Sequence, residues 1–286
     1  MAAGRQLSKG LLRKLQNTAK NILFYRCFSN INEETTHFGY ETISKEEKSE
    51  RVHHVFHNVA DKYDLMNDLM SGGIHRVWKD YFISKIHPRY GNKLLDVAGG
   101  TGDIAMRYLN YIKYERRKAM LPENQIIVCD VNQAMLHVGK RKAEHLGINQ
   151  EISWVCGNGE DLPFEDNSFD VYTIAFGIRN FTNIEKALDE AYRVLAPGGR
   201  FMCLEFSAVT NPVLERLYDM YSFQVIPIMG QIIAKDWDSY QYLVESIRQF
   251  PDQDEFSKMI NDSGFRMVNY ENLTFGIAAI HSAFKL

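Results

Sequence analysis

The sequence predicts an α/β domain with a mostly parallel, doubly wound sheet that helices cover on both faces. Short apolar runs predict five buried strands, which are residues 93–98, 125–129, 152–156, 171–176 and 200–206. Amphipathic helical patterns, such as 134–146 and 184–195, lie between them. Strands that alternate with helices form βαβ units, and such units pair their strands in parallel with both faces of the sheet covered.

The segments before and after this alternation predict further helices and a hairpin. Apolar residues at helical spacing predict a helix from about residue 48 to residue 70, ended by Gly72-Gly73, and a second helix over 76–86 before Pro88. The C-terminal elements are two helical patterns and two strand-like runs: 240–249, 253–262, 266–273 and 277–285. The short connection between the last two runs predicts an antiparallel hairpin.

Length and composition are those of a globular protein with one large domain or two modest ones. The chain has 286 residues, of which 45% are hydrophobic and 24% are charged. The first 32 residues contain six Lys and Arg and no acid, so the rest has 27 basic residues against 36 acidic ones. This acidic excess, without a basic cluster among aromatic residues, argues against nucleic-acid binding. The most apolar stretch, 223–234, is interrupted by Gln, Pro and Gly, which argues against a membrane-spanning helix.

The N-terminal segment has the composition of a mitochondrial presequence. Leucines and isoleucines recur at roughly helical spacing between basic residues, in a stretch without acid. The sequence Arg26-Cys27-Phe28-Ser29 is similar to arginine-directed cleavage sites. We therefore expect a presequence over 1–28, a linker over 29–47 and the folded domain over 48–286. The alternative is a surface amphipathic helix that binds a membrane or a partner.

The spacing of cysteines and histidines predicts neither a metal site nor a redox pair. None of the four cysteines stands in a CxxC spacing. His53 and His57 are one helical turn apart, but no third ligand accompanies them. We expect no bound metal.

A glycine-rich turn follows the first strand of the alternation, in Leu95-Asp96-Val97-Ala98-Gly99-Gly100-Thr101-Gly102-Asp103. Three glycines within four residues allow the backbone to approach a ligand and to aim its N–H groups at it. The glycine spacing is not that of the dinucleotide fingerprint and no Walker lysine follows, which argues against a nicotinamide dehydrogenase. A tight turn that binds nothing is the alternative.

Two further polar groups follow the next two strands. Asp130 ends the second strand, where an acid is placed to accept hydrogen bonds from both hydroxyls of a ribose. After the third strand, Asn158 and the amides of residues 157–159 are placed to bind an adenine edge, with Leu162 against the ring. The alternatives are an exposed loop aspartate and a simple Asn-Gly turn.

In this order and spacing, these segments resemble the class I S-adenosylmethionine (SAM)-dependent methyltransferases, and more narrowly the ubiquinone/menaquinone-biosynthesis C-methyltransferase family. The glycine motif is common to many methyltransferases, whereas its combination with residues 62–68 and 177–180 is highly specific. The resemblance covers nearly the whole body of the chain, at residues 36–39, 62–68, 71–79, 95–105, 176–180, 193–200, 204–207, 238–247 and 281–285.

The resemblance implies a class I SAM-methyltransferase-like fold: a doubly wound, mostly parallel seven-stranded sheet with a C-terminal antiparallel hairpin and N-terminal helices. It implies that SAM is the methyl donor. The implied SAM-binding residues are Gly99, Thr101, Gly102, Asp130, Asn158 and Gly159. Two positions depart from the pattern, because Ala175 stands where many bacterial members have serine and Gly159 where alanine is commoner.

The implied reaction is SAM-dependent C-methylation of a polyprenyl methoxy-benzoquinol ring in ubiquinone biosynthesis. A quinol carbon becomes nucleophilic when the neighbouring hydroxyl loses its proton, so the enzyme needs positioning and a route for that proton. Arg179 and Asn180 follow the fourth strand, at the edge of the sheet where ligands bind. Because arginine stays protonated, we expect Arg179 to orient a water and stabilise the phenolate, and Asn180 to hold a ring oxygen. An exposed arginine and a helix-capping asparagine are the alternative.

Two further segments are expected to contact the quinol. Tyr63 and Asn67, one helical turn apart, are expected to close its pocket, although Tyr63 as a core aromatic is an equal alternative. The apolar segment 218–233 is expected to form a tunnel for the polyprenyl tail, with core packing as the alternative.

The expected location is the matrix face of the mitochondrial inner membrane, with peripheral attachment. The expected partners are the polyprenyl benzoquinol and other ubiquinone-biosynthesis proteins in a membrane-associated complex, and a homodimer is left open. The alternatives are a menaquinone-type methylase, another small-molecule methyltransferase, and a scaffold with this fold that does not catalyse.

Overall fold

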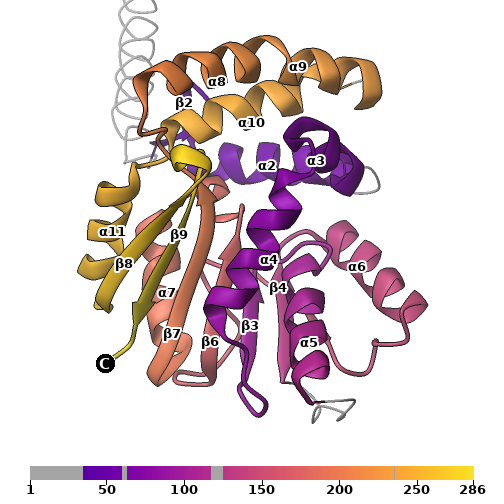
Figure 1. Ribbon diagram of the computed structural model, residues 1–286, viewed down its shortest axis with the longest axis vertical. Helices are drawn as coiled ribbons and strands as arrows, with labels where there is room; N and C mark the ends of the chain where they lie inside the picture. The colour runs from indigo at the N-terminus through magenta and orange to yellow at the C-terminus, as the bar shows by residue number, and fades with distance from the viewer. Residues whose placement is uncertain (1–34, 60–62, 117–124, 235) are drawn as a thin grey trace, which may run out of the picture. The chain divides into compact units, whose positions relative to one another are not determined.

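A seven-stranded sheet with the strand order β5-β4-β3-β6-β7-β9-β8 forms the centre of the fold (Figure 1). Its strands are β3 (Leu94–Val97), β4 (Ile126–Asp130), β5 (Ser153–Cys156), β6 (Phe169–Ala175), β7 (Leu195–Phe206), β8 (Arg266–Leu273) and β9 (Ala278–Phe284). This computed structural model describes residues 35–59, 63–116, 125–234 and 236–286. The presequence predicted over 1–28 lies outside the described residues.

The strand pairing confirms the predicted fold class. The strands from β5 to β7 pair in parallel, and β9 pairs antiparallel with both β7 and β8. β3 lies between β4 and β6, so the strand order reverses there, and ligands bind at the carboxyl ends of strands at such a point. The predicted C-terminal hairpin closes through a short turn, η4 (Thr274–Gly276). β7 begins earlier than predicted, because Leu195 already pairs with Phe169 across an irregularity.

Helices cover both faces of the sheet. α4 (Ile74–Ile86), α5 (Asp103–Arg116) and α6 (Gln133–His145) cover one face, and α7 (Ile184–Val194) and α11 (Gln253–Asp262) cover the other (Figure 1). Successive strand residues point to opposite faces. Accordingly, Leu94 and Met202 pack in the first cluster of buried residues, whereas Leu95 and Phe201 pack in the second. Two buried faces explain why the strands read as continuous apolar runs.

The N-terminal part differs from the expectation in two ways. Residues 35–44, assigned to a linker from the sequence, form the paired strands β1 (Thr35–Phe38) and β2 (Glu41–Ser44), with Gly39 at a positive φ of 57° between them. The single helix expected over 48–70 is two helices, α2 (Lys45–Val59) and α3 (Tyr63–Ser71). The Ser44 hydroxyl accepts the N–H of Glu47 at 3.2 Å, which favours a helix start at residue 45.

A layer of helices lies beyond the carboxyl ends of the strands (Figure 1). Its members are α2, α3, α8 (Pro212–Gln224), α9 (Ile226–Met229), the π-helical turn η3 (Gly230–Ala234) and α10 (Trp237–Gln249). The Asn211 side chain accepts N–H groups of Val213 and Leu214 and so starts α8, and Asp236 starts α10 in the same way. No helix of the described ranges combines the length and apolar character that crossing a membrane requires.

Candidate active site

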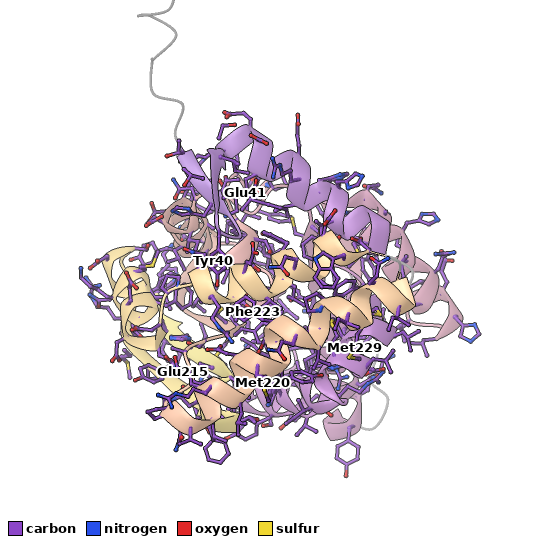
Figure 2. The ribbon with its side chains drawn as sticks, turned by 90° about the horizontal axis from the view of Figure 1, so that it is seen from above. Tyr40, Glu41, Glu215, Met220, Phe223 and Met229 are labelled. Atoms are coloured by element: carbon purple, nitrogen blue, oxygen red, sulfur yellow. The ribbon has the colours of Figure 1, made fainter. Side chains whose placement is uncertain are left out.

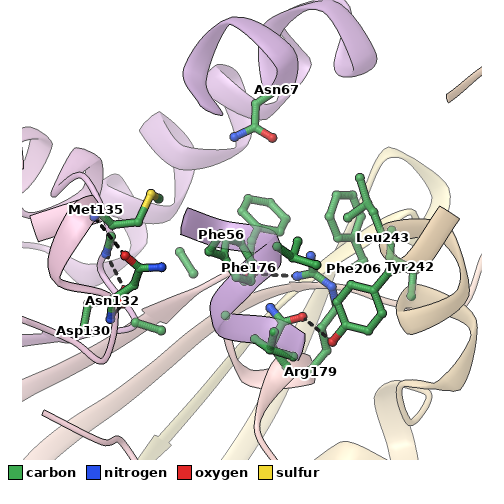
Figure 3. A pocket seen from close by; sticks show the side chains of 18 of the residues that line it. Phe56, Asn67, Asp130, Asn132, Met135, Phe176, Arg179, Phe206, Tyr242 and Leu243 are labelled. Atoms are coloured by element: carbon green, nitrogen blue, oxygen red, sulfur yellow. Dashed lines mark hydrogen bonds between the residues drawn. The ribbon is translucent and has the colours of Figure 1, made fainter. Parts of the chain in front are cut away.

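A cavity of about 1140 Å³ lies at the carboxyl ends of the central strands, beneath the helical layer (Figure 3). Two kinds of structure enclose it. One side, here the turn wall, consists of residues 96–103, 130–135 and 157–160, which follow or end β3, β4 and β5. The other side, here the helix wall, consists mainly of the cavity-lining residues of α2, α3, α4, α8, α9, α10 and η2 (Ile178–Asn180), together with Phe176, Phe181 and Phe206.

The glycine-rich turn after β3 has a backbone that larger residues would disturb. Ala98, Gly100 and Gly102 have positive φ values of 49°, 54° and 77°. A Cβ atom at Gly102 would lie 2.5 Å from the ring of Trp154, so the turn needs glycine there. Gly99 and Gly100 line the cavity, whereas Gly102 packs behind the turn against Trp154. Gly102 therefore shapes the turn rather than contacting a ligand directly.

Asp130 ties the first two turns together at the end of β4. Its Oδ2 accepts the N–H of Gly100 at 2.9 Å, and its Oδ1 accepts the N–H of Asn132 at 2.8 Å. Burial raises the pKa of Asp130, and the two N–H donors act against that rise. Asn132 in turn caps α6 by accepting the N–H groups of Ala134 and Met135 (Figure 3). Each carboxylate oxygen keeps further lone pairs, so Asp130 can accept two hydroxyl groups from a ligand.

The turn after β5 is linked to the loop after β6. Oδ1 of Asn158 accepts the N–H of Glu160 at 2.9 Å. The Glu160 carboxylate accepts the N–H of Thr182 at 2.6 Å and its hydroxyl at 2.8 Å. A Cβ atom at Gly159 would lie 2.6 Å from Cζ of Phe181. This contact gives a physical reason for glycine at a position where the resembling family more often has alanine.

Asp96 places a buried carboxylate in the turn wall. Oδ1 accepts the Thr173 hydroxyl at 2.8 Å, whereas Oδ2 is buried with no hydrogen-bond partner among the described residues. Burial raises the pKa of Asp96 to about 7, against the lowering effect of the Thr173 hydroxyl. An unpartnered buried carboxylate is stabilised by a positive charge nearby. The wall therefore fits SAM, which is a positively charged nucleoside.

Arg179 forms a buried ion pair. Its Nη1 donates to Oε1 of Glu205 at 2.8 Å. The same Nη1 donates to the carbonyl of Phe176 at 2.6 Å (Figure 3). The guanidinium also lies 5.4 Å from the ring centre of Phe206. Burial raises the pKa of Glu205, although Arg179 acts to lower it. Since Nη2 makes no hydrogen bond within the described part of the chain, it is the donor left for a ligand.

Asn180 is oriented by α10. The buried Tyr242 hydroxyl donates to Oδ1 of Asn180 at 3.0 Å (Figure 3). Burial raises the pKa of Tyr242, which keeps this hydroxyl a donor. Because Oδ1 accepts that bond, the amide NH₂ of Asn180 remains to meet a ligand oxygen. Asn67 lines the cavity from α3, whereas Tyr63 begins α3 and the prediction for its side chain lies outside the described residues.

An aromatic cluster lies between α4 and the ends of β6 and β7. The ring centres of Phe176 and Phe206 are 4.8 Å apart, and Trp78 of α4 lies 6.3 Å from each of them. The Trp78 indole N–H donates to the hydroxyl of Thr274 at 2.9 Å, which fixes the ring. All three rings line the cavity and give the helix wall a flat apolar surface.

Most of the predicted site residues line this one cavity: Gly99, Thr101, Asp130, Asn158 and Gly159 on the turn wall, and Asn67, Arg179 and Asn180 on the helix wall. Sequence reasoning missed Asp96, Glu160, Glu205 and Tyr242. A signal existed for two of these, since Asp96 and Glu205 are acids within apolar strand runs, where charged residues are rare unless they are paired or functional. Across the described ranges, no group of three or more His, Cys, Asp and Glu residues is arranged to hold a metal ion.

The chain matches a family model and many curated proteins. The model of the ubiE/COQ5 methyltransferase family matches residues 43–285. A protein of Bos taurus named "2-methoxy-6-polyprenyl-1,4-benzoquinol methylase, mitochondrial" is 58% identical over 276 residues, which cover 88% of this chain and 84% of that protein. The proteins of the same name from Homo sapiens and Danio rerio are 56% and 54% identical, covering 88% and 98% of this chain and 84% and 92% of theirs.

Solved structures of low sequence identity share the fold. A SAM-dependent methyltransferase of Thermotoga maritima has a TM-score of 0.58 at 17% identity, over 82% of this chain and 99% of that chain. The [4+2]-cyclase SpnF has a TM-score of 0.58 at 16% identity, over 83% of this chain and 96% of that chain. At such identities, the likeness concerns the fold alone.

Proposed function

Because this chain belongs to the ubiE/COQ5 methyltransferase family, we propose that it transfers the methyl group of SAM to a ring carbon of 2-methoxy-6-polyprenyl-1,4-benzoquinol in ubiquinone biosynthesis. The observation that carries this proposal is the cavity with two unlike walls, one shaped for a nucleoside and one for an aromatic ring. The names of the relatives also place them in mitochondria, and we assign this chain to the same organelle.

The turn wall would hold SAM through backbone groups and two acids, the half-buried Asp130 and the buried Asp96. When bound, SAM supplies an electrophilic methyl group on a positively charged sulfur. Asp130 would accept the ribose hydroxyls, and Asn158 with Gly159 would border the adenine. The Asp96 carboxylate favours the positive charge of the donor, since its Oδ2 lacks any partner among the described residues.

The helix wall would hold the quinol and assist loss of its hydroxyl proton. The rings of Trp78, Phe176 and Phe206 offer a flat surface to the quinol ring. Nη2 of Arg179 and the amide of Asn180 are the donors for its oxygens. Because Glu205 neutralises much of the Arg179 charge, Arg179 acts as an oriented donor more than as a free cation. Holding the two reactants in attack geometry can lower the activation free energy by ~7–11 kcal/mol.

The direct test of this function is the position of the transferred methyl group. The enzyme is incubated with SAM labelled with ¹³C at the methyl group and with a reduced methoxy-benzoquinol that carries a short prenyl tail. The expected product has the label on a ring carbon, as NMR correlations from the methyl protons to ring carbons will establish. Label on an oxygen, or no transfer while calorimetry shows SAM binding, would contradict the proposal and favour an O-methylase or a scaffold.

An apolar stripe on the outer face of α8, α9 and η3 supports peripheral attachment to the inner membrane. Its exposed residues recur at helical spacing and are Val213, Leu217, Met220, Val225, Ile228 and Ile232. The opposite face of the same helices, with Tyr218, Tyr221 and Ile226, lines the cavity. Figure 2 looks onto this layer, with Met220 on α8 and Met229 on α9. Exposed apolar patches of this kind mark surfaces that bind a membrane or a protein partner.

We therefore assign this apolar stripe to the lipid surface from which a polyprenyl quinol enters the cavity. Flotation with phosphatidylcholine vesicles compares the wild type with Leu217→Glu and Met220→Glu, and Val77→Glu on α4 is the matched exposed control. We expect only the stripe variants to lose flotation and turnover of long-tailed quinol in vesicles, while turnover of a soluble short-tailed quinol persists. If the stripe variants still float but change their oligomeric state, the stripe would instead be an interface with a second copy of the chain. If they still float and remain monomeric, the assignment to the lipid surface would also be wrong.

A further inference from the structure

His75 of α4 is a buried histidine in the wall of the cavity to which no role has been assigned above. It lies four residues after Ser71, which ends α3, and one helical turn before Lys79 of α4. Lys79 in turn donates to Asp103 at 2.8 Å, directly after the glycine-rich turn. His75 is therefore tied through α4 to the turn wall, while its own ring faces α3.

Hydrogen bonding fixes the tautomer of His75. The Ser71 hydroxyl lies 2.6 Å from the carbonyl oxygen of Asn67 and 2.7 Å from Nδ1 of His75. A carbonyl can only accept, so the single hydroxyl proton of Ser71 points to Asn67. The hydroxyl oxygen must then accept from Nδ1–H of His75. Neutral His75 consequently carries its proton on Nδ1 and a free lone pair on Nε2.

Nε2 of His75 is a proton acceptor whose charged form has a stabilising neighbour. It makes no hydrogen bond with the described residues, and Oδ1 of Asp68 lies 3.6 Å away. Arg76 holds the Asp68 carboxylate with two hydrogen bonds, at 2.5 and 2.6 Å. Burial lowers the pKa of His75, and Lys79 and Arg76 act in the same direction, while Asp68 and Asp103 act to raise it. The ring is thus neutral near pH 7 and able to take up a proton.

His75 lines the same cavity as the aromatic cluster assigned to the quinol. Trp78 lies three residues further along α4 and packs against Phe176, whose carbonyl accepts from Arg179. His75 and Arg179 therefore line this cavity from different elements, α4 and η2. A 1,4-quinol has hydroxyls at opposite ends of its ring, and such a ring requires polar groups from two directions.

Four other ionisable groups of the cavity are poorly suited to accept this proton. Asp103 is engaged by Lys79 and Arg107, which lower its pKa to about 2 although burial acts to raise it. Oδ2 of Asp96 is enclosed in the turn wall, where a quinol oxygen cannot reach it. Arg179 stays protonated. The carboxylate of Glu160 already accepts hydrogen bonds from Thr182 and Asn183.

We propose that Nε2 of His75 is the catalytic base that accepts the hydroxyl proton of the bound quinol. The proposal rests on the proposed function. The quinol O–H bond breaks and an N–H bond forms on His75, which becomes an imidazolium beside Asp68. The ring carbon next to the resulting phenolate forms its bond to the methyl group as the sulfur–methyl bond breaks and the electron pair stays on sulfur. The ring carbon then loses its own proton while the oxygen regains one, and His75 releases its proton to solvent.

The pH dependence of turnover is the first test. A base must be neutral to act, so kcat/KM of the wild type is expected to fall on the acid side, with a midpoint below the ordinary histidine value of about 6.5. His75→Asn keeps an N–H for Ser71 but has no basic nitrogen. Its kcat should be at least about 100-fold lower, and its pH profile should lack this fall on the acid side, the acid limb. Added imidazole should restore part of the rate. His137→Asn, on the exposed face of α6, is the matched control and should keep both the rate and the limb.

A second readout needs neither SAM nor turnover. A methoxy-nitrophenol binds as a mimic of the quinol, and its visible absorption reports whether it is ionised. We expect the wild type to bind it as the phenolate below its solution pKa, and His75→Asn and His75→Gln to bind it as the neutral phenol. Phenolate binding by both variants, or an acid limb kept by His75→Asn, would overturn the assignment. If the wild type ionises the mimic but does not methylate the quinol, the proposed function fails and the catalytic role of His75 fails with it, although His75 then still accepts a proton from a bound phenol.

Discussion

The two walls of the cavity differ in whether backbone or side chains form them. The turn wall consists mainly of backbone held between the ends of neighbouring parallel strands, as where Asp130 at the end of β4 accepts N–H groups of Gly100 after β3 and of Asn132. The helix wall consists of side chains held by partners far away in the sequence, such as Asn180 with Tyr242 and Trp78 with Thr274. Substitutions in the turn wall should therefore change donor affinity. Substitutions in the helix wall should change turnover. Those that leave a buried charge without its partner should also lower stability.

The largest effect is expected from breaking the buried ion pair of the helix wall. Glu205→Ala leaves the Arg179 guanidinium buried without its carboxylate, and such a change destabilises a protein by about 3–5 kcal/mol. Urea denaturation measures the free energy of unfolding. Asp262→Ala removes an exposed pair with Lys258 and is the control, with an expected loss of about 0–1 kcal/mol. Similar losses in both variants would show that the buried Arg179–Glu205 pair contributes no more to stability than an exposed pair.

The next largest effect is expected at the centre of the turn wall. Asp130→Ala removes both acceptors for the ribose and frees the N–H groups of Gly100 and Asn132. Two lost hydrogen bonds to a charged group correspond to a rise in the Kd for SAM of about 100-fold or more. Calorimetry measures this rise, and kcat at saturating SAM should change much less. Asp161→Ala, an exposed neighbour, should leave the Kd unchanged, whereas a pure loss of kcat in Asp130→Ala would assign Asp130 to the acceptor side.

A smaller effect is expected where the two walls touch. Gly159→Ala brings a methyl group into Phe181, and this overpacking should weaken SAM binding about tenfold. The double variant Gly159→Ala, Phe181→Leu makes room for the methyl group and should recover most of the affinity. A double variant as weak as the single one would show that the glycine serves the ligand itself and not the packing.

The smallest effect concerns the pH dependence that Asp96 contributes. The pKa of Asp96 is raised to about 7 in the folded protein, so the folded state favours its protonated form. Its contribution to the free energy of unfolding is therefore complete below the unfolded pKa of about 3.9. That contribution is lost as the pH rises to about 7. A positively charged ligand lowers this pKa, so the binding of SAM should release protons. The affinity for SAM should accordingly rise a few-fold as the pH rises through 7. Calorimetry in two buffers of different ionisation enthalpy measures the release. Asp96→Asn should abolish it, and an unaltered release would place the titrating group elsewhere.

The position of the turn wall could be predicted from the sequence because the parallel sheet determines it. Each turn directly follows an apolar strand, and parallel strands bring their carboxyl ends to one edge, so Asp130 and Asn158 had to lie near the glycine-rich turn. Gly102 is the instructive exception. It belongs to the same motif, but its role is contact with Trp154, which comes from another strand.

The helix wall was only partly predictable because its contacts join helices and strands whose pairing no sequence pattern fixes. Arg179 and Asn180 stood out by their place after a strand, but nothing nearby in the sequence announced Glu205 or Tyr242 as their partners. The helices α8 and α9 were missed as helices, since apolar residues on both faces remove the one-sided pattern that identifies a helix. Similarly, residues 35–44 read as a polar linker because two short, largely exposed strands show little apolar alternation.

The central claim is that one cavity brings a nucleoside donor on the turn wall to a quinol on the helix wall. A crystal structure with SAM and a quinol analogue tests it most directly. We predict ribose hydroxyls on Asp130, and an analogue ring on Phe176 and Phe206 with its oxygens at Arg179, Asn180 or His75. Donor density elsewhere with an empty turn wall, or an analogue bound away from these rings, would contradict the account.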